Sequence, residues 1–201
     1  MKKFISNIST GEIDNLKFQI SKSRILDWGS YSVDDAGISY KRLSLILDYW
    51  QNKFSWKKEE NKLNKFDQYV FEKDDCHTHF LHIKSNKKNA IPLLLIHGWP
   101  GSIFEFFDLI PLLVNPLQNT SLDHQHFNLI IPSLPNVGFS FLKNKPPLGL
   151  EEISDHFINL MESLGYGNYF IQGGDLGSFI ASIMSVKVPD KIHGIHLNML
   201  P

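Results

Sequence analysis

Apolar positions follow a helical period in the first part of the chain and gather into short continuous runs in the second. Between Lys41 and Phe54, apolar side chains recur every three or four residues, which predicts a helix with one apolar face. Up to about Lys88 the chain is charged and favours helix, and the pattern changes after Ser85–Asn89. The pattern therefore predicts an N-terminal arm followed by a region that is built differently.

Short apolar runs in the second part predict strands, and amphipathic segments between them predict helices. A continuous apolar run is typical of a strand that is buried on both faces of a sheet. Strands that alternate with helices favour a parallel sheet with right-handed crossovers, and hence the α/β class. We expect strands at Thr78–Ile83, Ile91–Ile96, Asn128–Pro132, Asn168–Gln172 and Ile192–Leu197, and helices at Phe104–Leu113, Glu151–Leu164 and Ser178–Val186.

Composition and charge narrow the class of protein. The 201 residues are 42% hydrophobic with a formal net charge of −1, which is ordinary for a globular chain. Nucleic-acid binding is disfavoured, because it needs a concentrated basic face. The single cysteine, Cys76, allows no intrachain disulfide. No segment is apolar for the ~18 to 20 residues of a membrane span, so the sequence predicts a soluble chain.

The first chemical candidate is H-G-W-P-G-S, His97–Ser102, directly after a predicted buried strand. In α/β sheets the loops at the carboxyl ends of strands carry the chemistry. Two glycines and a proline favour a sharp turn, in which the Trp99 N–H can bind an oxyanion. The alternative is a plain turn, with Ser102 and Glu105 as an S-x-x-E capping box and Glu105 a cap rather than an acid or base.

The second candidate is G-G-D-L-G, Gly173–Gly177, between an apolar run and a helical pattern. This is the context of a nucleophile elbow, a strained turn that presents its central residue, here Asp175. The glycines would remove clashes, and the Leu176 N–H would lie beside the carboxylate at the start of a helix. A carboxylate there can attack an sp3 carbon and form an ester. The alternative is an aspartate that only caps the helix.

The order of the turns along the chain favours the reactive interpretation of both candidates. The H-G-W-P turn follows one predicted strand, L-P-N-V-G-F-S (Leu134–Ser140) follows the next, and the elbow follows the third. The carboxyl ends of parallel strands meet at one edge of a sheet. We therefore expect the three turns to converge on one site.

These segments together resemble the N-terminal half of epoxide hydrolases of the microsomal and juvenile-hormone type, a family with the α/β-hydrolase fold. The resemblance covers nearly the whole chain, and its motifs are highly specific as a set. The matching segments are D-Y-W (Asp48–Trp50), F-S-W-K-K-E-E-N-K-L-N-K-F (Phe54–Phe66), H-F-L-H-I (His79–Ile83), H-G-W-P-G-S-I-F-E-F (His97–Phe106), G-F-S (Gly138–Ser140), L-M-E-S-L-G-Y (Leu160–Tyr166), Q-G-G-D-L-G-S (Gln172–Ser178) and G-I-H-L-N-M (Gly194–Met199).

The resemblance implies an enzyme that converts lipophilic epoxides to vicinal diols through an aspartyl ester, without a cofactor or metal. Asp175 would be the nucleophile, and Trp99 and Leu176 would supply the backbone N–H groups of an oxyanion hole. It also implies a protein of the cytoplasm or of the periphery of the endoplasmic reticulum membrane, whose oligomeric state stays open. The supporting loop residues would be His97, Gly98, Pro100, Gly173, Gly174 and Gly177.

Three features depart from the family pattern. Leu176 stands where the family usually has tryptophan, and Asn136-Val137 stands where it has glycine-tyrosine. The chain ends at Pro201, about where the family inserts its lid, so the lid, the catalytic histidine and its acid are expected to be absent. We therefore expect an α/β-hydrolase fold, with a mostly parallel sheet that is truncated before the lid. Residues 1–110 would be the N-terminal region, with a helical arm, and residues 111–201 a partial catalytic domain.

Other functions stay open at this point. A chain of this kind can be an inactive remnant that acts at most as a binding protein, and haloalkane dehalogenases also use an elbow aspartate, although the N-terminal arm favours the epoxide group. None of the nine histidines is convincing as a base. His77, His79 and His82 are not expected to bind metal, because His82 faces away on a strand and no Cys or Glu cluster completes the set.

Overall fold

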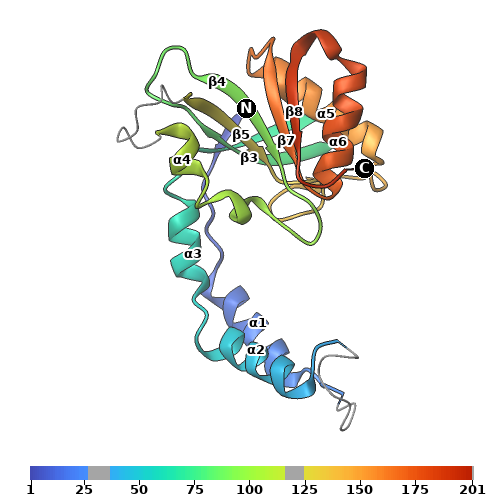
Figure 1. The fold of residues 1–201 in the computed structure, drawn as a ribbon. Helices are drawn as coiled ribbons and strands as arrows, with labels where there is room; N and C mark the ends of the chain where they lie inside the picture. Colours follow the sequence, from blue (N-terminus) through green and yellow to red (C-terminus); the bar gives the residue numbers. More distant parts are fainter. Residues whose placement is uncertain (27–36, 116–124, 201) are drawn as a thin grey trace. The chain divides into compact units, whose positions relative to one another are not determined.

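The computed structural model describes residues 1–26, 37–115 and 125–200. The chain forms two compact units, which are described separately (Figure 1). The larger unit comprises Met1–Ile5 and Phe66–Pro201, and the smaller unit comprises Ser6–Lys65.

An eight-stranded sheet forms the larger unit, in the order β1-β2-β3-β5-β4-β7-β8, with β6 paired to β3. The strands β5, β4, β7 and β8 are parallel neighbours, whereas β1, β2, β3 and β6 pair antiparallel. The expectation of a mostly parallel α/β-hydrolase sheet is confirmed for the part that carries the predicted turns. The strands are β1 (Lys2–Phe4), β2 (Gln68–Lys73), β3 (Cys76–Ile83), β4 (Ile91–Ile96), β5 (Phe127–Pro132), β6 (Phe141–Leu142), β7 (Tyr169–Gly173) and β8 (Ile192–Leu197).

Strand β4 shows how the two faces of the sheet are used, because successive side chains point to opposite faces. Leu94 and Ile96 belong to the hydrophobic core that includes residues of α5 (Leu150–Ser163) and α6 (Leu176–Lys187). Leu93 and Leu95 instead line a cavity on the side of α4 (Ile110–Val114). Both faces of β4 are therefore apolar, as its continuous apolar run predicts.

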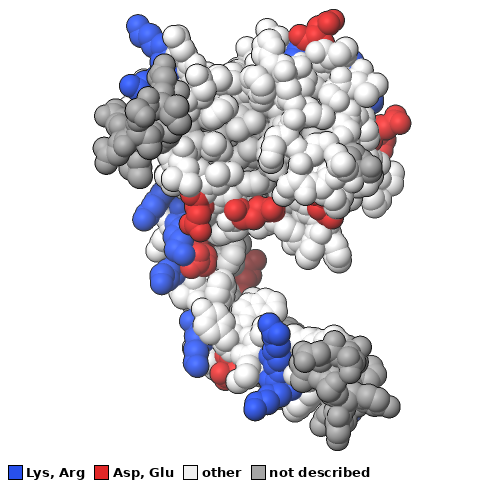
Figure 2. All heavy atoms as spheres, viewed as in Figure 1, with Lys and Arg blue, Asp and Glu red and all other residues white. Residues whose placement is uncertain are grey.

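An apolar cavity of about 830 Å³ lies against this second face of the sheet. Its walls come from β4, β5, β7 and β8 and from the segment Glu105–Leu113. Polar groups enter at Glu105, Gln172 and Asn198, and the Gln172 Oε1 atom is buried without a hydrogen-bond partner among the described residues. Figure 2 shows that much of the visible surface of the larger unit carries no charged side chain.

The prediction of one continuous helix over Phe104–Leu113 is wrong. The structure has a short 3₁₀ helix, η1 (Ile103–Phe106), followed by α4, which begins at Ile110. Pro111 explains the break, because proline lacks an N–H and its ring clashes with the carbonyl four residues earlier in a continuous helix. A second 3₁₀ helix, η2 (Pro189–Lys191), precedes β8.

The strands β1 and β2 lie in the part of the chain whose composition favours helix. They pair with each other, and β2 pairs with β3 across its whole length. Their charged and half-exposed residues are typical of the edge region of a sheet, where charge discourages pairing with another chain. Composition alone therefore misassigned this segment.

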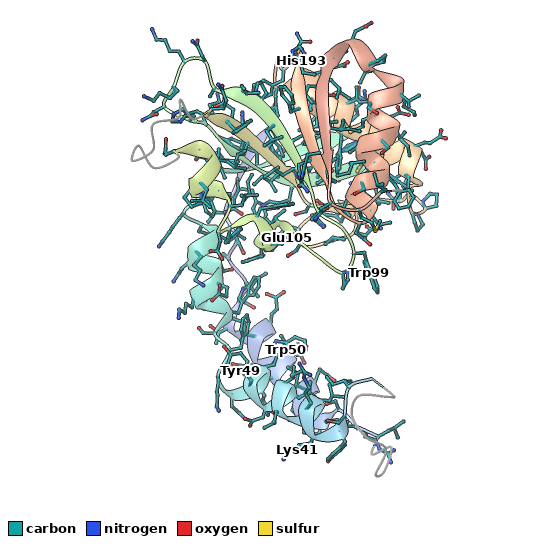
Figure 3. The ribbon with its side chains drawn as sticks, in the orientation of Figure 1. Lys41, Tyr49, Trp50, Trp99, Glu105 and His193 are labelled. Atoms are coloured by element: carbon teal, nitrogen blue, oxygen red, sulfur yellow. The ribbon has the colours of Figure 1, made fainter. Side chains whose placement is uncertain are left out.

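The smaller unit contains α1 (Thr10–Lys22), α2 (Tyr40–Asn52) and α3 (Trp56–Leu63). Each helix begins after a serine whose hydroxyl accepts a backbone hydrogen bond, which satisfies a free N–H of the first turn. The helix α2 confirms the helical period read from Lys41 onward, and Figure 3 shows Lys41, Tyr49 and Trp50 along it. In the described residues, no helix combines the length and the apolar character that crossing a bilayer requires.

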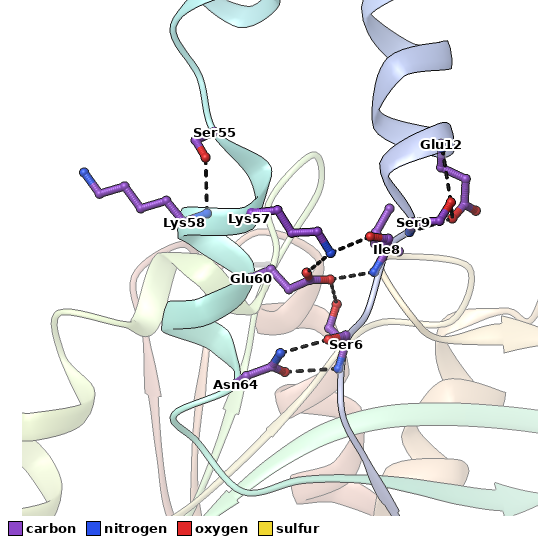
Figure 4. A network of polar contacts seen from close by, with 9 residues as sticks. All are labelled: Ser6, Ile8, Ser9, Glu12, Ser55, Lys57, Lys58, Glu60 and Asn64. Atoms are coloured by element: carbon purple, nitrogen blue, oxygen red, sulfur yellow. Dashed lines mark hydrogen bonds and ion pairs between the residues drawn. The ribbon is translucent and has the colours of Figure 1, made fainter.

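A network centred on Glu60 joins α3 to the segment that precedes α1 (Figure 4). The Glu60 carboxylate accepts hydrogen bonds from the Ser6 hydroxyl at 2.8 Å and the Ile8 N–H at 2.7 Å. The Lys57 ammonium lies 2.7 Å from the same carboxylate and also donates to the Ile8 carbonyl. Burial raises the pKa of Glu60, but Lys57, Ile8 and Ser6 outweigh that effect and lower it to about 2.

Replacing Glu60 by glutamine should destabilise the smaller unit by about 1–3 kcal/mol at neutral pH, since it removes a charge from a buried network. Because the pKa of Glu60 falls on folding, its contribution is complete above pH 4.5 and disappears as the pH falls towards about 2. Urea unfolding measured at several pH values checks both statements. The matched control is Glu59→Gln, which breaks the more exposed pair with Lys62 and should change stability by less than about 1 kcal/mol. An equal loss in both variants would contradict the role given to Glu60.

Candidate functional site

The backbone at Asp175 has the conformation of a strained elbow. The residue joins β7 to α6 with φ 51° and ψ −123°. A positive φ is unfavourable for a residue with a Cβ, and it persists only where the surrounding structure enforces it. Asp175 is the N-cap residue of α6, yet its side chain does not make the usual capping hydrogen bond to the second or third helical residue. The geometry is thus that of a presented side chain rather than of an ordinary cap.

Close backbone packing explains the glycines on both sides of Asp175. A Cβ on Gly173 would lie 2.2 Å from the Gly177 carbonyl oxygen, and a Cβ on Gly177 would lie 2.3 Å from the Ile96 carbonyl oxygen. These distances are far below contact distance, and the atoms involved are backbone atoms that cannot move aside. Gly174 is constrained in a similar way by the side chain of Asn198, which follows β8. The elbow therefore depends on the strands beside it.

The Asp175 carboxylate is held by backbone N–H groups from two turns. The Trp99 N–H donates to Asp175 Oδ1 at 2.8 Å. Hydrogen bonds from the backbone of Trp99 and of Leu176 lower the pKa of Asp175 below its ordinary value. The carboxylate is therefore ionised near neutral pH, and it is exposed to solvent. An exposed, ionised carboxylate in a fixed position has the properties that nucleophilic attack requires.

The turn after β4 lies directly against this carboxylate. A Cβ on Gly98 would fall 2.3 Å from the Asp175 Cβ, so only glycine lets the turn approach so closely. The next residue, Trp99, directs its N–H to Asp175 while 72% of its surface stays exposed (Figure 3). The peptide bond between Trp99 and Pro100 is cis. The structure thus brings Gly98, Trp99 and Asp175 together.

His97 connects this turn to the turn after β5. Its Nδ1 lies 2.8 Å from the Gly98 carbonyl, and its Nε2 accepts the Leu134 N–H at 3.0 Å. The Nε2 acceptor role requires a neutral ring with the proton on Nδ1. Burial lowers the pKa of His97, which favours that neutral form. The three turns expected to converge therefore meet at the carboxyl ends of neighbouring strands, as predicted.

Two positions that depart from the family pattern can be placed in this arrangement. Leu176 is partly buried and packs against the hydrophobic core, while its backbone still serves Asp175. Asn136 has φ 62°, a left-handed conformation that glycine and asparagine tolerate best. Its Oδ1 also accepts the Leu142 N–H at 3.1 Å. Asparagine thus suits the backbone of a position where the family has glycine.

Most described histidines have partners away from Asp175. His79 is buried between Ser133 and Gln68, His82 contacts the Tyr166 hydroxyl, and His77 stacks on Phe141. In residues 1–26, 37–115 and 125–200, no group of three or more His, Cys, Asp or Glu side chains is arranged to hold a metal ion. His156 forms a hydrogen bond with the Thr78 hydroxyl, and His126 with the Val114 carbonyl. His193 and His196 are exposed on β8. His124 lies outside the described residues.

Two side chains make contacts near the elbow that the sequence did not predict. Asn198 packs against Gly174, and Glu105 lies against Gly101 of the turn after β4. The capping box predicted at Ser102 is present in part: the Glu105 carboxylate accepts a hydrogen bond from the Ser102 backbone, as predicted, whereas the Ser102 hydroxyl accepts the Phe104 N–H rather than the Glu105 N–H. No local pattern marks Asn198, because its partner is distant in the chain.

Comparison with known families divides the chain into two overlapping matches. Residues 1–106 match the family described as the epoxide hydrolase N terminus, and residues 91–200 match the alpha/beta hydrolase fold. Each match covers more than half of the chain, and they meet over the strand and turn that lead to the site. The resemblance drawn from the motifs is therefore confirmed.

Individual relatives agree with this assignment. The chain is 35% identical to juvenile hormone epoxide hydrolase 1 of Ctenocephalides felis, covering 99% of this chain and 43% of that protein. It is 34% identical to epoxide hydrolase 1 of Sus scrofa, covering 99% of this chain and 45% of that protein. The solved epoxide hydrolase of Aspergillus niger superimposes with a TM-score of 0.85 at 33% identity, covering all of this chain and 52% of that one. The chain thus spans about half the length of the relatives it matches.

Proposed function

This chain belongs to the epoxide hydrolase family of the α/β-hydrolase fold, and we propose that its Asp175 opens lipophilic epoxides by forming an ester with a ring carbon. The observation that carries the proposal is the ionised, exposed Asp175 carboxylate, which is held in a strained elbow by the Trp99 N–H at 2.8 Å. The relatives named as epoxide hydrolases support the class of substrate.

In the first step, one Asp175 oxygen attacks an epoxide carbon as the carbon–oxygen bond of the ring breaks. The ring oxygen leaves as an alkoxide and takes up a proton from water, so the product is a hydroxyalkyl ester of Asp175. A freely accessible carboxylate favours this attack, and its backbone donors fix the direction of approach. Haloalkane dehalogenase chemistry would use the same carboxylate, but the family match favours the epoxide.

In the second step, water attacks the carboxyl carbon of the ester, and the diol leaves. As water adds and before the diol leaves, negative charge develops on the ester carbonyl oxygen, which is the Asp175 oxygen that did not attack the epoxide; the Trp99 N–H is directed at the Asp175 oxygen Oδ1, which would take this role. In this proposal Trp99, with Leu176, would act as the oxyanion donor for ester hydrolysis. His97, Gly98, Pro100, Gly173, Gly174 and Gly177 would shape the two turns that hold these donors.

The second step also requires a base that activates the attacking water. His79, His82, His97, His126 and His156 have polar partners elsewhere. A histidine that activates water must lie within reach of the ester carbon, and the hydrogen bonds of these five side chains are made to groups other than Asp175. We therefore propose that this chain forms the ester faster than it releases the diol.

Incubation with styrene oxide tests the function. We expect the intact mass of the purified chain to increase by one epoxide, with the adduct mapped by peptide sequencing to Asp175, and little diol to accumulate. Rapid diol release would support the complete hydrolase and refute the proposed accumulation. If neither an adduct nor a diol is detected, the proposed function is contradicted and an inactive remnant is favoured.

The proposal also covers the location of the protein in the cell and the roles of the two regions of the chain. We propose that the protein lies in the cytoplasm or at the periphery of the endoplasmic reticulum membrane, as the resemblance to epoxide hydrolases of the microsomal type implies. Residues 1–110 would act as the N-terminal region, and residues 111–201 would belong to the catalytic domain around the elbow.

A further inference from the structure

The turn from Gly98 to Gly101 lies between two carboxylates. On one side Gly98 contacts the Asp175 side chain, and a Cβ added there would lie 2.6 Å from Asp175 Oδ1. On the other side a Cβ added to Gly101 would lie 2.5 Å from Glu105 Oε1. Figure 3 shows Trp99 and Glu105 on the segment that joins β4 to α4. Each end of the turn is therefore a glycine with an acidic side chain packed against it: the Asp175 Cβ, which is fixed to the backbone, at Gly98, and the Glu105 carboxylate, which can move, at Gly101.

Glu105 holds its end of the turn through the backbone. Its carboxylate receives a hydrogen bond from the backbone of Ser102, the residue that follows Gly101. Partial burial, together with the negative charge of Asp175, raises the pKa of Glu105, whereas the Ser102 bond lowers it. The two carboxylates are thus close enough to interact across the turn.

The outer side of the turn offers little other support. Trp99 is 72% exposed and Pro100 is also exposed, so packing on that side does not fix the peptide that carries the Trp99 N–H. The inner contacts are those of His97 with the Gly98 carbonyl, of Gly98 with Asp175, and of Glu105 with Gly101 and Ser102. Of these contacts, those made by Glu105 are the ones at the Gly101 end of the turn.

We propose that Glu105 is a positioning residue that fixes the Gly98–Gly101 turn so that the Trp99 N–H stays directed at Asp175 Oδ1. It touches neither the epoxide nor the reacting carboxylate, and its effect on rate rests on the proposed function. Its effect on the turn stands by itself, because the contacts with Gly101 and Ser102 exist without substrate.

The test compares Glu105→Ala with Glu105→Gln in the full chain. Alanine removes the acceptor of the Ser102 N–H, so the Trp99 amide should lose its fixed position. We expect adduct formation on Asp175 to slow by about tenfold to a hundredfold, and the Trp99 amide resonance to shift and exchange faster with solvent. Glutamine keeps an acceptor oxygen, so it should restore both readouts to within about threefold of the parent chain.

The matched control is Glu152→Ala. Glu152 accepts the Gly149 N–H at 2.8 Å in the same kind of contact, at the start of α5. A general loss of stability would affect both alanine variants, whereas the proposal expects the Trp99 amide to change only with Glu105. Unchanged Trp99 exchange in Glu105→Ala would overturn the proposal.

A second variant tests the contact without removing the carboxylate. Gly101→Ala should push the Glu105 carboxylate away and reproduce the Glu105→Ala shift of the Trp99 amide. In a chain that already carries Glu105→Ala, the closest contact of the added methyl, the one with the Glu105 carboxylate, is gone, and the Gly98 carbonyl oxygen at 3.1 Å is the next in distance, so little further change is expected. Additive effects would contradict the coupling. If the parent chain forms no adduct at all, the proposed function fails, while the amide measurements still decide the role of Glu105.

Discussion

Replacing Asp175 by asparagine should abolish adduct formation with styrene oxide, reducing its rate by roughly 10⁴-fold or to below detection. The amide is nearly the same size as the carboxylate and keeps an oxygen that can accept the Trp99 N–H, so the elbow should persist. What disappears is the negative charge that attacks the epoxide carbon. The measurement is the intact protein mass over time, with the modified peptide identified after digestion.

The control for this variant is Asp190→Asn, which changes an exposed aspartate on η2, beyond the C-terminal end of α6. Its adduct rate should match that of the parent chain. The proposal would fail if Asp175→Asn formed the adduct at the parental rate, because the epoxide would then be reacting with another side chain. Equal unfolding midpoints for the three chains would show that any loss of rate is chemical.

The second large effect is expected for Gly177→Ala, which should lower the free energy of unfolding by about 3–5 kcal/mol or prevent folding. The new Cβ would lie 2.3 Å from the Ile96 carbonyl oxygen and 2.9 Å from the Ile96 carbonyl carbon. Both atoms belong to the backbone of β4, which pairs with β5 and β7 on either side. Neither the strand nor α6 can shift without breaking these contacts.

Urea unfolding followed by tryptophan fluorescence measures this loss, and the soluble yield measures it if the variant does not fold. Gly167→Ala is the control, because a Cβ on Gly167 would have no atom within 4 Å and its backbone has no positive φ. That variant should change stability by no more than about 0.5 kcal/mol. Equal stability of the two variants would show that α6 does not pack on β4 as closely as described.

Local sequence was sufficient for the elements that bring the site together. The apolar runs at Ile91–Ile96 and Ile192–Leu197 are strands with these same limits. Glycine, proline and aspartate at the ends of such runs marked the turns, since few other residues allow the required backbone. The order of those turns was enough to predict that they meet, because parallel strands place their carboxyl ends at one edge.

Local sequence was not sufficient where a residue is determined by a neighbour distant in the chain. The sequence alone suggests that Gly98 is a flexible turn residue. In the structure, glycine is required there because the Asp175 side chain, 77 positions later in the chain, leaves no room for a Cβ. Glu105 reads as a helix cap, and only the folded turn shows it next to Gly101 and within the influence of Asp175. The proline that divides Phe104–Leu113 was visible, yet the apolar period outweighed it in the prediction.

Residue types and their spacing thus established the fold class, the family and the identity of Asp175 as the candidate nucleophile, because these depend on backbone conformations that few residues permit. The folded chain was needed for the hydrogen bond from the Trp99 N–H, the neutral state of His97 and the position of Glu105. Those properties arise from atoms that approach to within a few ångströms only when β4, β5 and β7 lie side by side, and spacing along the chain does not encode such distances.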